Sequence, residues 1–268
     1  MYEASVRPGY PLIAISSPVI TPFIFWFFFF FTLKFVQKDN FKLADFIFIS
    51  LGVIFILATS RRVLFLSFFI CVLIIIVLVK ALSRELRATI KSRIRNTIGM
   101  LSILVIVLFS WLASIGLINE HTLSEFLSKT SDKSDNARTE QVASLIEGWQ
   151  ENPLFGAGPG VDAGISRSEI PGMYEMSYIA KLFETGLIGF SIYILLWGTL
   201  FYWTIKCIRR SSIPVQYILA TLSGMTIFML SNATNPYLLA FDYMWFMYVP
   251  FVIINYTFPG YKLSNGKN

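Results

Sequence analysis

Charged residues are scarce in this sequence of 268 residues. Asp, Glu, Lys and Arg make up only 14% of it, whereas hydrophobic residues make up 55%. A soluble domain of this length needs far more charge on its surface, so the composition excludes an ordinary soluble enzyme. Apolar runs long enough to cross about 30 Å of hydrocarbon recur along the chain. These runs predict an integral membrane protein.

Side chains that bind metals are also rare. The chain has two cysteines and one histidine, and both Cys71 and Cys207 lie in or beside apolar runs. The sequence contains no Cys or His spacing typical of a metal site, no Walker loop and no Asp-x-Asp pair. We therefore expect a reaction that uses no metal ion and no other cofactor.

Seven apolar runs are candidate membrane spans. They are Leu12–Leu33, Phe41–Thr59, Val63–Val79, Ile98–Ile118, Tyr178–Ile205, Val215–Leu230 and Leu238–Tyr256. The runs are continuously apolar and do not alternate, which argues against barrel strands. We predict an all-α, polytopic transmembrane bundle of about seven helices, in which the Phe27–Phe31 run faces lipid.

The domain boundaries follow from these runs. Residues 1–118 hold the first four spans, 119–177 form one long loop, 178–258 hold the last three spans, and 259–268 form a tail. At about 58 residues the loop is long enough to expect a function for it.

Basic residues favour alternate loops of the chain. One set of loops carries 14 of the 22: Lys34, Lys38, Lys42, Lys80, Arg84, Arg87, Lys91, Arg93, Arg95, Lys206, Arg209, Arg210, Lys262 and Lys267. The positive-inside rule places this set in the cytoplasm and the long loop outside. Orientation in the bilayer therefore explains the net charge of +6 without nucleic acid. The N-terminus also falls outside, without a cleavable signal, so we expect missing helices upstream of Met1.

The long loop contains the pattern of an amphipathic helix. Apolar residues recur at helical spacing, namely Val142, Leu145, Ile146 and Trp149. Ser134 or Asp135 can cap the start of this helix, and Asn152-Pro153 ends it. We expect the helix to lie against the bundle or on the membrane surface.

Four features of the predicted outer face are candidates for chemistry. Arg61 and Arg62 suit a bidentate grip on a phosphate or diphosphate, or they extend to lipid headgroups. Arg138 lies in the first turn of the loop helix and is either a ligand for an anion or a solvated surface arginine. Glu175 lies where the loop returns to the bilayer, as a functional carboxylate or a helix-start residue.

The fourth feature is a glycine-rich turn. Gly156, Gly158 and Gly160 occupy alternate positions, and such a turn can expose backbone N–H groups as a nest for phosphate. Glycine-rich turns without a ligand are common, so the alternative is an ordinary tight turn.

Three segments resemble the O-antigen polymerase and ligase superfamily. They are Arg138 to Trp149 with the following Asn152-Pro153-Leu154-Phe155-Gly156-Ala157-Gly158, the helix start from Tyr178 to Gly189, and Ser60-Arg61-Arg62. The resemblance implies a GT-C-like glycosyltransferase in the bacterial cytoplasmic membrane, with its long loop outside. Its substrate would be an undecaprenyl-diphosphate-linked oligosaccharide, and a chain-length regulator would be a further partner.

The resemblance also implies roles for the candidate residues. Arg61 or Arg62 and Arg138 would hold the diphosphate of the lipid-linked donor. The ligase branch of the superfamily has a histidine just before the tyrosine of the helix start, whereas this chain has Glu175-Met176 there. This departure favours a polymerase-like member, in which Glu175 is the general base for the acceptor hydroxyl.

Three functions remain open at this point. The first is a polymerase of polysaccharide repeat units, and the second is a ligase that transfers glycan to lipid A core or to protein. The third is a transporter or permease, which would be expected to place ionisable residues deep within its spans. The chain keeps its charges near helix ends, with Asp45 and Asp242 the nearest exceptions, which favours an enzyme.

Overall fold

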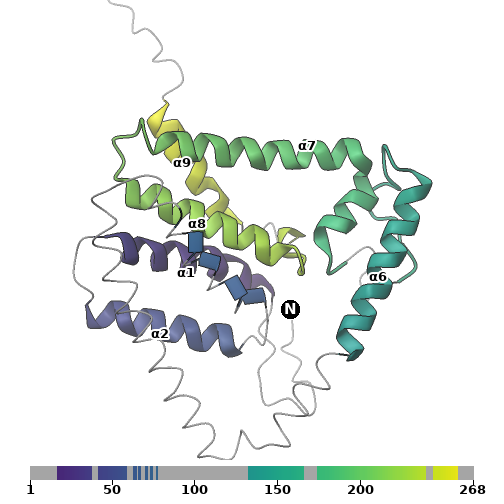
Figure 1. The fold of residues 1–268 in the computed structure, drawn as a ribbon, viewed down its shortest axis with the longest axis horizontal. Helices are drawn as coiled ribbons and strands as arrows, with labels where there is room; N and C mark the ends of the chain where they lie inside the picture. The colour runs from purple at the N-terminus through teal and green to yellow at the C-terminus, as the bar shows by residue number, and fades with distance from the viewer. Residues whose placement is uncertain are drawn as a thin grey trace, which may run out of the picture. The chain divides into compact units, whose positions relative to one another are not determined.

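Helices are the regular secondary structure of the part of the chain that the structure describes. The computed structural model describes residues 17–37, 42–58, separate positions between 63 and 77, 132–165, 174–239 and 244–258. These residues form helices and turns and contain no strand, in agreement with the predicted all-α class (Figure 1). Of the predicted spans, Ile98–Ile118 lies outside the described residues.

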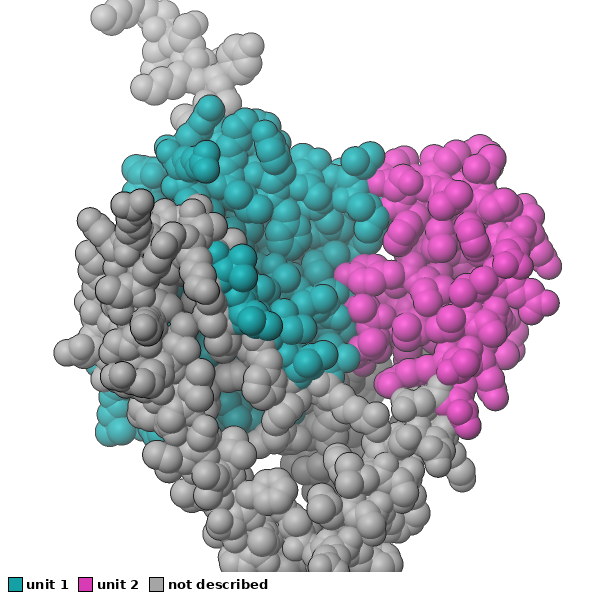
Figure 2. Space-filling model, viewed as in Figure 1, with its two compact units in different colours: residues 1–90, 193–232, 237–268 teal, residues 91–192, 233–236 magenta. Residues whose placement is uncertain are grey.

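Two compact units divide the chain. The first comprises Met1–Ile90, Tyr193–Asn232 and Tyr237–Asn268, and the second comprises Lys91–Ile192 and Ala233–Pro236 (Figure 2). The second unit therefore combines the described part of the long loop with the start of the following helix and four residues from farther along the chain.

Three helices form the centre of the first unit. Helix α1 (Ser17–Val36) lies between α2 (Leu43–Ala58) and α8 (Val215–Asn232) (Figure 1). A side chain at Gly224 of α8 would come within 2.9 Å of the Phe25 carbonyl oxygen, so glycine is what allows α8 to approach α1 this closely.

The phenylalanine run of α1 corrects one prediction. Phe27, Phe28 and Phe31 are at most 1% exposed, and only Phe30 of the run is substantially exposed, at 39%. These rings stack on one another and on neighbouring aromatic side chains instead of facing lipid. The helix is apolar on all sides because it is enclosed by other helices, and composition alone does not distinguish this situation from exposure to lipid.

Helix α7 (Ser177–Cys207) corresponds to the fifth predicted span and breaks at Gly186. Gly186 has φ 62° and ψ −172°, so residues 177–185 and 187–207 are two helical segments. Among the described residues, α7 is the one helix both long and apolar enough to cross a membrane. Three shorter apolar helices accompany it: Ile20–Val36, Leu43–Ile56 and Trp245–Thr257.

The last predicted span, Leu238–Tyr256, is not one continuous helix. Its described residues form the 3₁₀ turns η1 (Tyr237–Leu239) and η3 (Trp245–Met247), followed by α9 (Tyr248–Thr257). Pro250 explains the late start of α9, because proline lacks an N–H and its ring clashes with the carbonyl four residues earlier. Within the first turn of α9 that N–H has no helical partner to lose.

The second unit is built around helix α6 (Asp132–Glu151) and the first segment of α7. The structure confirms the predicted loop helix and begins it at Asp132, so Ser134 and Asp135 lie inside it and do not precede it. Leu145 is fully buried against Tyr174, Ala180 and Phe183.

The apolar face of α6 therefore packs within its own unit. Gly148 belongs to this face as well, because a side chain there would come within 2.6 Å of the Phe183 ring. Ile146, which was predicted to share the face, is 37% exposed. The apolar face is thus centred on Leu145 and Gly148, and it faces the start of α7.

Candidate functional site

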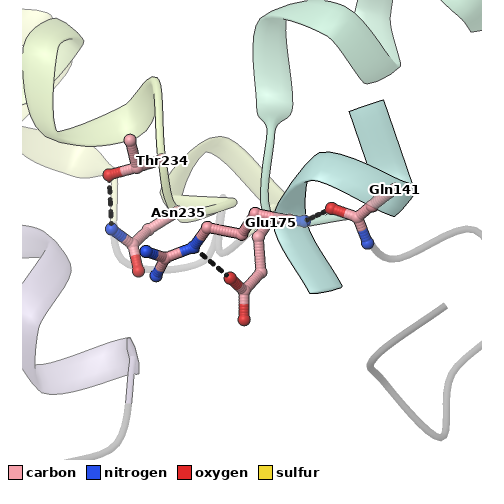
Figure 3. A network of polar contacts seen from close by, with 5 residues as sticks. Gln141, Glu175, Thr234 and Asn235 are labelled. Carbon is pink, nitrogen blue, oxygen red and sulfur yellow. Dashed lines mark hydrogen bonds and ion pairs between the residues drawn. The ribbon is translucent and has the colours of Figure 1, made fainter. Parts of the chain in front are cut away.

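Two of the residues singled out from the sequence meet in the second unit. The Nε atom of Arg138 donates a hydrogen bond to Oε2 of Glu175 at 3.0 Å, and the two side chains form an ion pair (Figure 3). Arg138 comes from the first part of α6, and Glu175 lies two residues before α7. The side chains are 37% and 29% exposed, so a ligand from outside can reach both.

Gln141 fixes the backbone of Glu175. Its Oε1 accepts a hydrogen bond from the Glu175 N–H at 3.0 Å, and the residue is fully buried (Figure 3). Arg138 and Gln141 are three positions apart on α6 and so lie on the same side of the helix. One helix face thus holds Glu175 at two points, its carboxylate and its main-chain N–H.

The other end of the Gln141 amide has no hydrogen-bond partner among the described residues. Its Nε2 atom is buried, and a buried donor without an acceptor costs about 1–3 kcal/mol. This donor lies in the same side chain that holds Glu175, so one polar group beside the Arg138–Glu175 pair has no partner among the residues that the structure describes.

A polar segment after α8 completes this network. Ser177 donates through its Oγ to the carbonyl oxygen of Asn235 at 3.1 Å, and Asn235 Nδ2 donates to Thr234 Oγ1 at 3.1 Å. Figure 3 shows the Asn235 side chain on the side of Glu175 where the carboxylate meets its arginine partner. The segment is thus hydrogen-bonded to Ser177, two residues after Glu175.

The glycine-rich turn has a structural role in this protein. The N–H groups of Ala157 and Gly158 donate to the carbonyl oxygens of Phe183 and Glu184, at 2.8 and 3.0 Å. These carbonyls belong to the last turn of the first segment of α7, which the break leaves without helical partners. The turn therefore caps that segment.

The same turn also caps the second segment of α7. The carbonyl oxygens of Pro153 and Leu154 accept from the N–H groups of Leu187 and Ile188, at 2.9 and 3.1 Å. The N–H of Gly156 donates to the Asn152 carbonyl at 2.8 Å.

These bonds bear on the expected phosphate nest at Gly156, Gly158 and Gly160. The nest requires N–H groups that point outward, but those of Gly156 and Gly158 already donate to backbone carbonyls. All three glycines have positive φ, between 75° and 101°, which explains the choice of residue without a ligand.

Tyr174 anchors the loop that follows the glycine-rich turn. Its hydroxyl accepts a hydrogen bond from the Ala163 N–H at 2.6 Å and lies 3.3 Å from both the Val161 carbonyl and Asp162 Oδ1. Burial is the main cause that raises the pKa of this hydroxyl above its usual value. Ser144 of α6 also donates to the Ala163 carbonyl, so α6 and Tyr174 hold this part of the loop from two sides.

The remaining candidate residues have different outcomes. Arg61 and Arg62 lie outside the described residues. Lys181 and Glu184, three positions apart on α7, form an ion pair at 3.0 Å. The described ranges contain no group of three or more His, Cys, Asp or Glu side chains that could hold a metal ion.

Sequence reasoning did not single out Gln141, Thr234 or Asn235. For Gln141 a signal existed, because it lies three positions after Arg138 and on the same helix face. For Thr234 and Asn235 the signal was a run of small and polar residues, Ser231 to Asn235, between two apolar stretches.

The described residues thus give a helical protein in which α7 has the length and composition to cross a membrane and a charged pair lies just before that helix. A profile of the O-antigen ligase family matches residues 46–194, more than half of the chain. The chain belongs to this family, as the resemblance predicted. No curated protein and no solved structure gives a match.

Membership in the family has direct consequences for class. The family suggests glycan transfer of the O-antigen ligase or polymerase type, and its proteins are membrane proteins. An enzyme of polysaccharide biosynthesis is therefore favoured over a transporter. The matched range includes both Arg138 and Glu175.

Proposed function

We propose that this protein polymerises polysaccharide repeat units, by transferring a growing glycan from undecaprenyl diphosphate to a sugar hydroxyl of a second lipid-linked unit. The observation that carries the proposal is the meeting of Arg138 and Glu175. A cation suited to a diphosphate and a carboxylate suited to an alcohol lie 3.0 Å apart at their nearest atoms, although 37 positions separate them.

The reaction needs both groups at once. An oxygen lone pair of the acceptor hydroxyl attacks the anomeric carbon of the donor glycan, and the bond from that carbon to the diphosphate oxygen breaks. The bonding electrons leave with undecaprenyl diphosphate, whose growing negative charge Arg138 stabilises. Glu175 takes the hydroxyl proton as the new glycosidic bond forms.

The exposure of the pair fits a site that substrate enters. A partly exposed ion pair contributes only about 0–1 kcal/mol to stability, so the fold has little need of it. A diphosphate that binds Arg138 replaces the carboxylate as its counter-ion and releases Glu175 toward the acceptor. Arg61 and Arg62, at an outer helix end in the predicted topology, would bind the same diphosphate.

The glycine-rich turn has a supporting part in this proposal. Because it caps both segments of α7, it fixes the position of the residues just before and after the break. Glu175 lies two residues before the start of the first segment, and the turn caps the other end of that segment.

Replacement of each partner tests the proposal in the strain that produces the polysaccharide. We expect Arg138→Ala and Glu175→Gln each to abolish long polymer while the protein stays in the membrane at its normal level. Lys34→Ala is the matched control, because Lys34 forms an ion pair of similar length, 2.9 Å, with Asp45 in the first unit. Normal ladders of chain length in both variants would overturn the mechanism.

Glycan ligation is the second candidate function, and the description of the matched family favours it. In this case the same pair would act on a lipid A core or protein acceptor. A deletion strain distinguishes the two functions: single repeat units accumulate if the protein is a polymerase, whereas unattached long polymer accumulates if it is a ligase.

A further inference from the structure

An exposed apolar group surrounds the break in α7. Leu154 is 54% exposed and Phe155 is 75% exposed, on the turn that follows α6. Leu187 and Ile188, the first residues of the second segment of α7, are 44% and 45% exposed. Four large apolar side chains exposed to this extent are costly in water, and a group of this kind is typical of a surface that meets a partner or a membrane.

Backbone hydrogen bonds fix this group as one surface. Leu187 N–H donates to the Pro153 carbonyl at 2.9 Å, and Ile188 N–H donates to the Leu154 carbonyl at 3.1 Å. The turn thus lies at the same level along α7 as the first residues of its second segment.

The length of the second segment of α7 indicates where Leu187 and Ile188 would lie in a bilayer. Residues 187–207 form 21 residues of helix, which at 1.5 Å each span about 31 Å, close to the thickness of the hydrocarbon layer. Lys206 marks one end, and Arg209 and Arg210 follow it. Leu187 and Ile188 then mark the opposite boundary of the hydrocarbon.

The exposed side chains along the segment continue the same surface. Ile192 is 53% exposed and Leu195 is 67% exposed, as expected of a helix that contacts lipid. By contrast, the exposed residues of α6 include Glu140, Glu147 and Glu151, which suit water. The turn therefore lies at the border between an apolar and an acidic surface.

We propose that Leu154 and Phe155 insert into the bilayer beside α7 and contact lipid acyl chains just below the headgroups. The occupant is lipid, because the apolar group is continuous with the exposed apolar face of a membrane-length helix and lies at its hydrocarbon boundary. The insertion ties the second unit to the membrane surface at the α7 break. This inference does not depend on the proposed reaction.

Spin labelling of the full-length protein in phosphatidylcholine–phosphatidylglycerol vesicles tests the insertion. A nitroxide on Phe155→Cys, with Cys71 and Cys207 replaced by Ser, reports collisions with oxygen, which enriches in hydrocarbon, and with a water-soluble nickel chelate. Labels on Leu195→Cys and Glu147→Cys serve as the lipid and water controls. A label on Ile188→Cys provides a second position at the proposed level.

We expect the ratio of oxygen to nickel accessibility at positions 155 and 188 to shift from the value at 147 toward that at 195. Nickel accessibility at 155 equal to that at 147 would place the turn in water and overturn the inference. Low accessibility to both reagents at 155 would also overturn it, because protein and not lipid would then cover Phe155.

Discussion

Gly156 and Gly186 pack backbone against backbone within the second unit. A Cβ atom on Gly156 would lie 2.5 Å from the Gly186 nitrogen, and a Cβ atom on Gly186 would lie 2.5 Å from the Gly156 nitrogen. Both residues also have positive φ, 75° and 62°. Neither position accepts a side chain, so the two glycines together define how the turn caps the broken helix.

Alanine at either glycine should therefore destabilise the second unit. The positive φ costs an alanine about 1–2 kcal/mol, and the steric overlap adds about 1–3 kcal/mol. Gly160→Ala is the matched control, because Gly160 has φ 81° but nothing within 4 Å of an added Cβ. Thermal unfolding in detergent should show a clearly larger loss for Gly156→Ala and Gly186→Ala than for Gly160→Ala. Equal losses in all three would mean that the close approach is unimportant.

The break in α7 shows what local sequence can and cannot predict. Helical periodicity was enough to predict α6, because its apolar residues repeat within one segment. The same reasoning predicted one unbroken span from Tyr178 to Ile205, since Gly186 is a single glycine inside an apolar run. Its break depends on the turn at Gly156, 30 positions earlier, and no local pattern contains that contact.

The roles of the two residues in the ion pair can be tested by exchanging them in a double variant. In Arg138→Glu with Glu175→Arg, opposite charges face each other again, but the cation and the base have exchanged elements. If both groups act on substrate, the exchanged variant should stay as inactive as each single variant, about 10²–10⁴-fold below the native enzyme. The measurement is polymer formation from lipid-linked units at equal protein levels in membranes. Recovery of activity in the exchanged variant would assign the pair a structural role only.

Replacement of Gln141 should lower activity more than stability. Gln141→Met removes the hydrogen bond to the Glu175 N–H, worth about 1 kcal/mol, but it also removes a buried donor that has no partner among the described residues. The two effects on folding should nearly cancel. If the loss of this hydrogen bond raises the activation free energy by the same amount, about 1 kcal/mol, turnover becomes roughly fivefold slower. Turnover per molecule and membrane abundance are measured together, and a parallel fall in both would contradict a positioning role.

Gln141 also shows why the site was only partly predictable. Arg138 and Glu175 stood out because charge is rare in this chain and because they match a family pattern. Gln141 is a neutral side chain on a polar helix. Only the fold reveals that it is buried and hydrogen-bonded to Glu175. A helical pattern gives the face of α6 but not the segment that packs on it.

The raised pKa of Tyr174 predicts that the protein loses stability at alkaline pH. Its folded-state pKa is raised by burial, so the folded protein holds the hydroxyl proton more tightly than the unfolded chain does. The resulting contribution is complete below the unfolded pKa of about 10 and is lost as pH rises through the folded pKa. Tyr174→Phe should cost about 1 kcal/mol near neutral pH, through the lost partner of the Ala163 N–H, and should lack this alkaline loss. Thermal unfolding of both proteins from pH 8 to 11.5 measures the difference, and identical profiles above pH 10 would contradict the assignment.

A buried polar contact in the first unit allows a test of how much hydrogen bonds between helices contribute to its stability. Cys71 Sγ lies 3.0 Å from Ser223 Oγ and 3.6 Å from Thr32 Oγ1, and all three side chains are at most 1% exposed. Such bonds between membrane helices contribute on average about 0.6 kcal/mol, so Ser223→Ala should destabilise only slightly.

Ser223→Leu should have a much larger effect than Ser223→Ala. Added volume at this buried position of α8 must displace neighbouring side chains, at a cost of about 1–3 kcal/mol. Unfolding in SDS, monitored by tryptophan fluorescence, gives both values. Cys71→Ser is the matched control, because its hydroxyl keeps a donor and an acceptor between Thr32 and Ser223. If the leucine variant is as stable as the alanine variant, α8 does not pack at this position, and the contact of Cys71 with Ser223 loses its support.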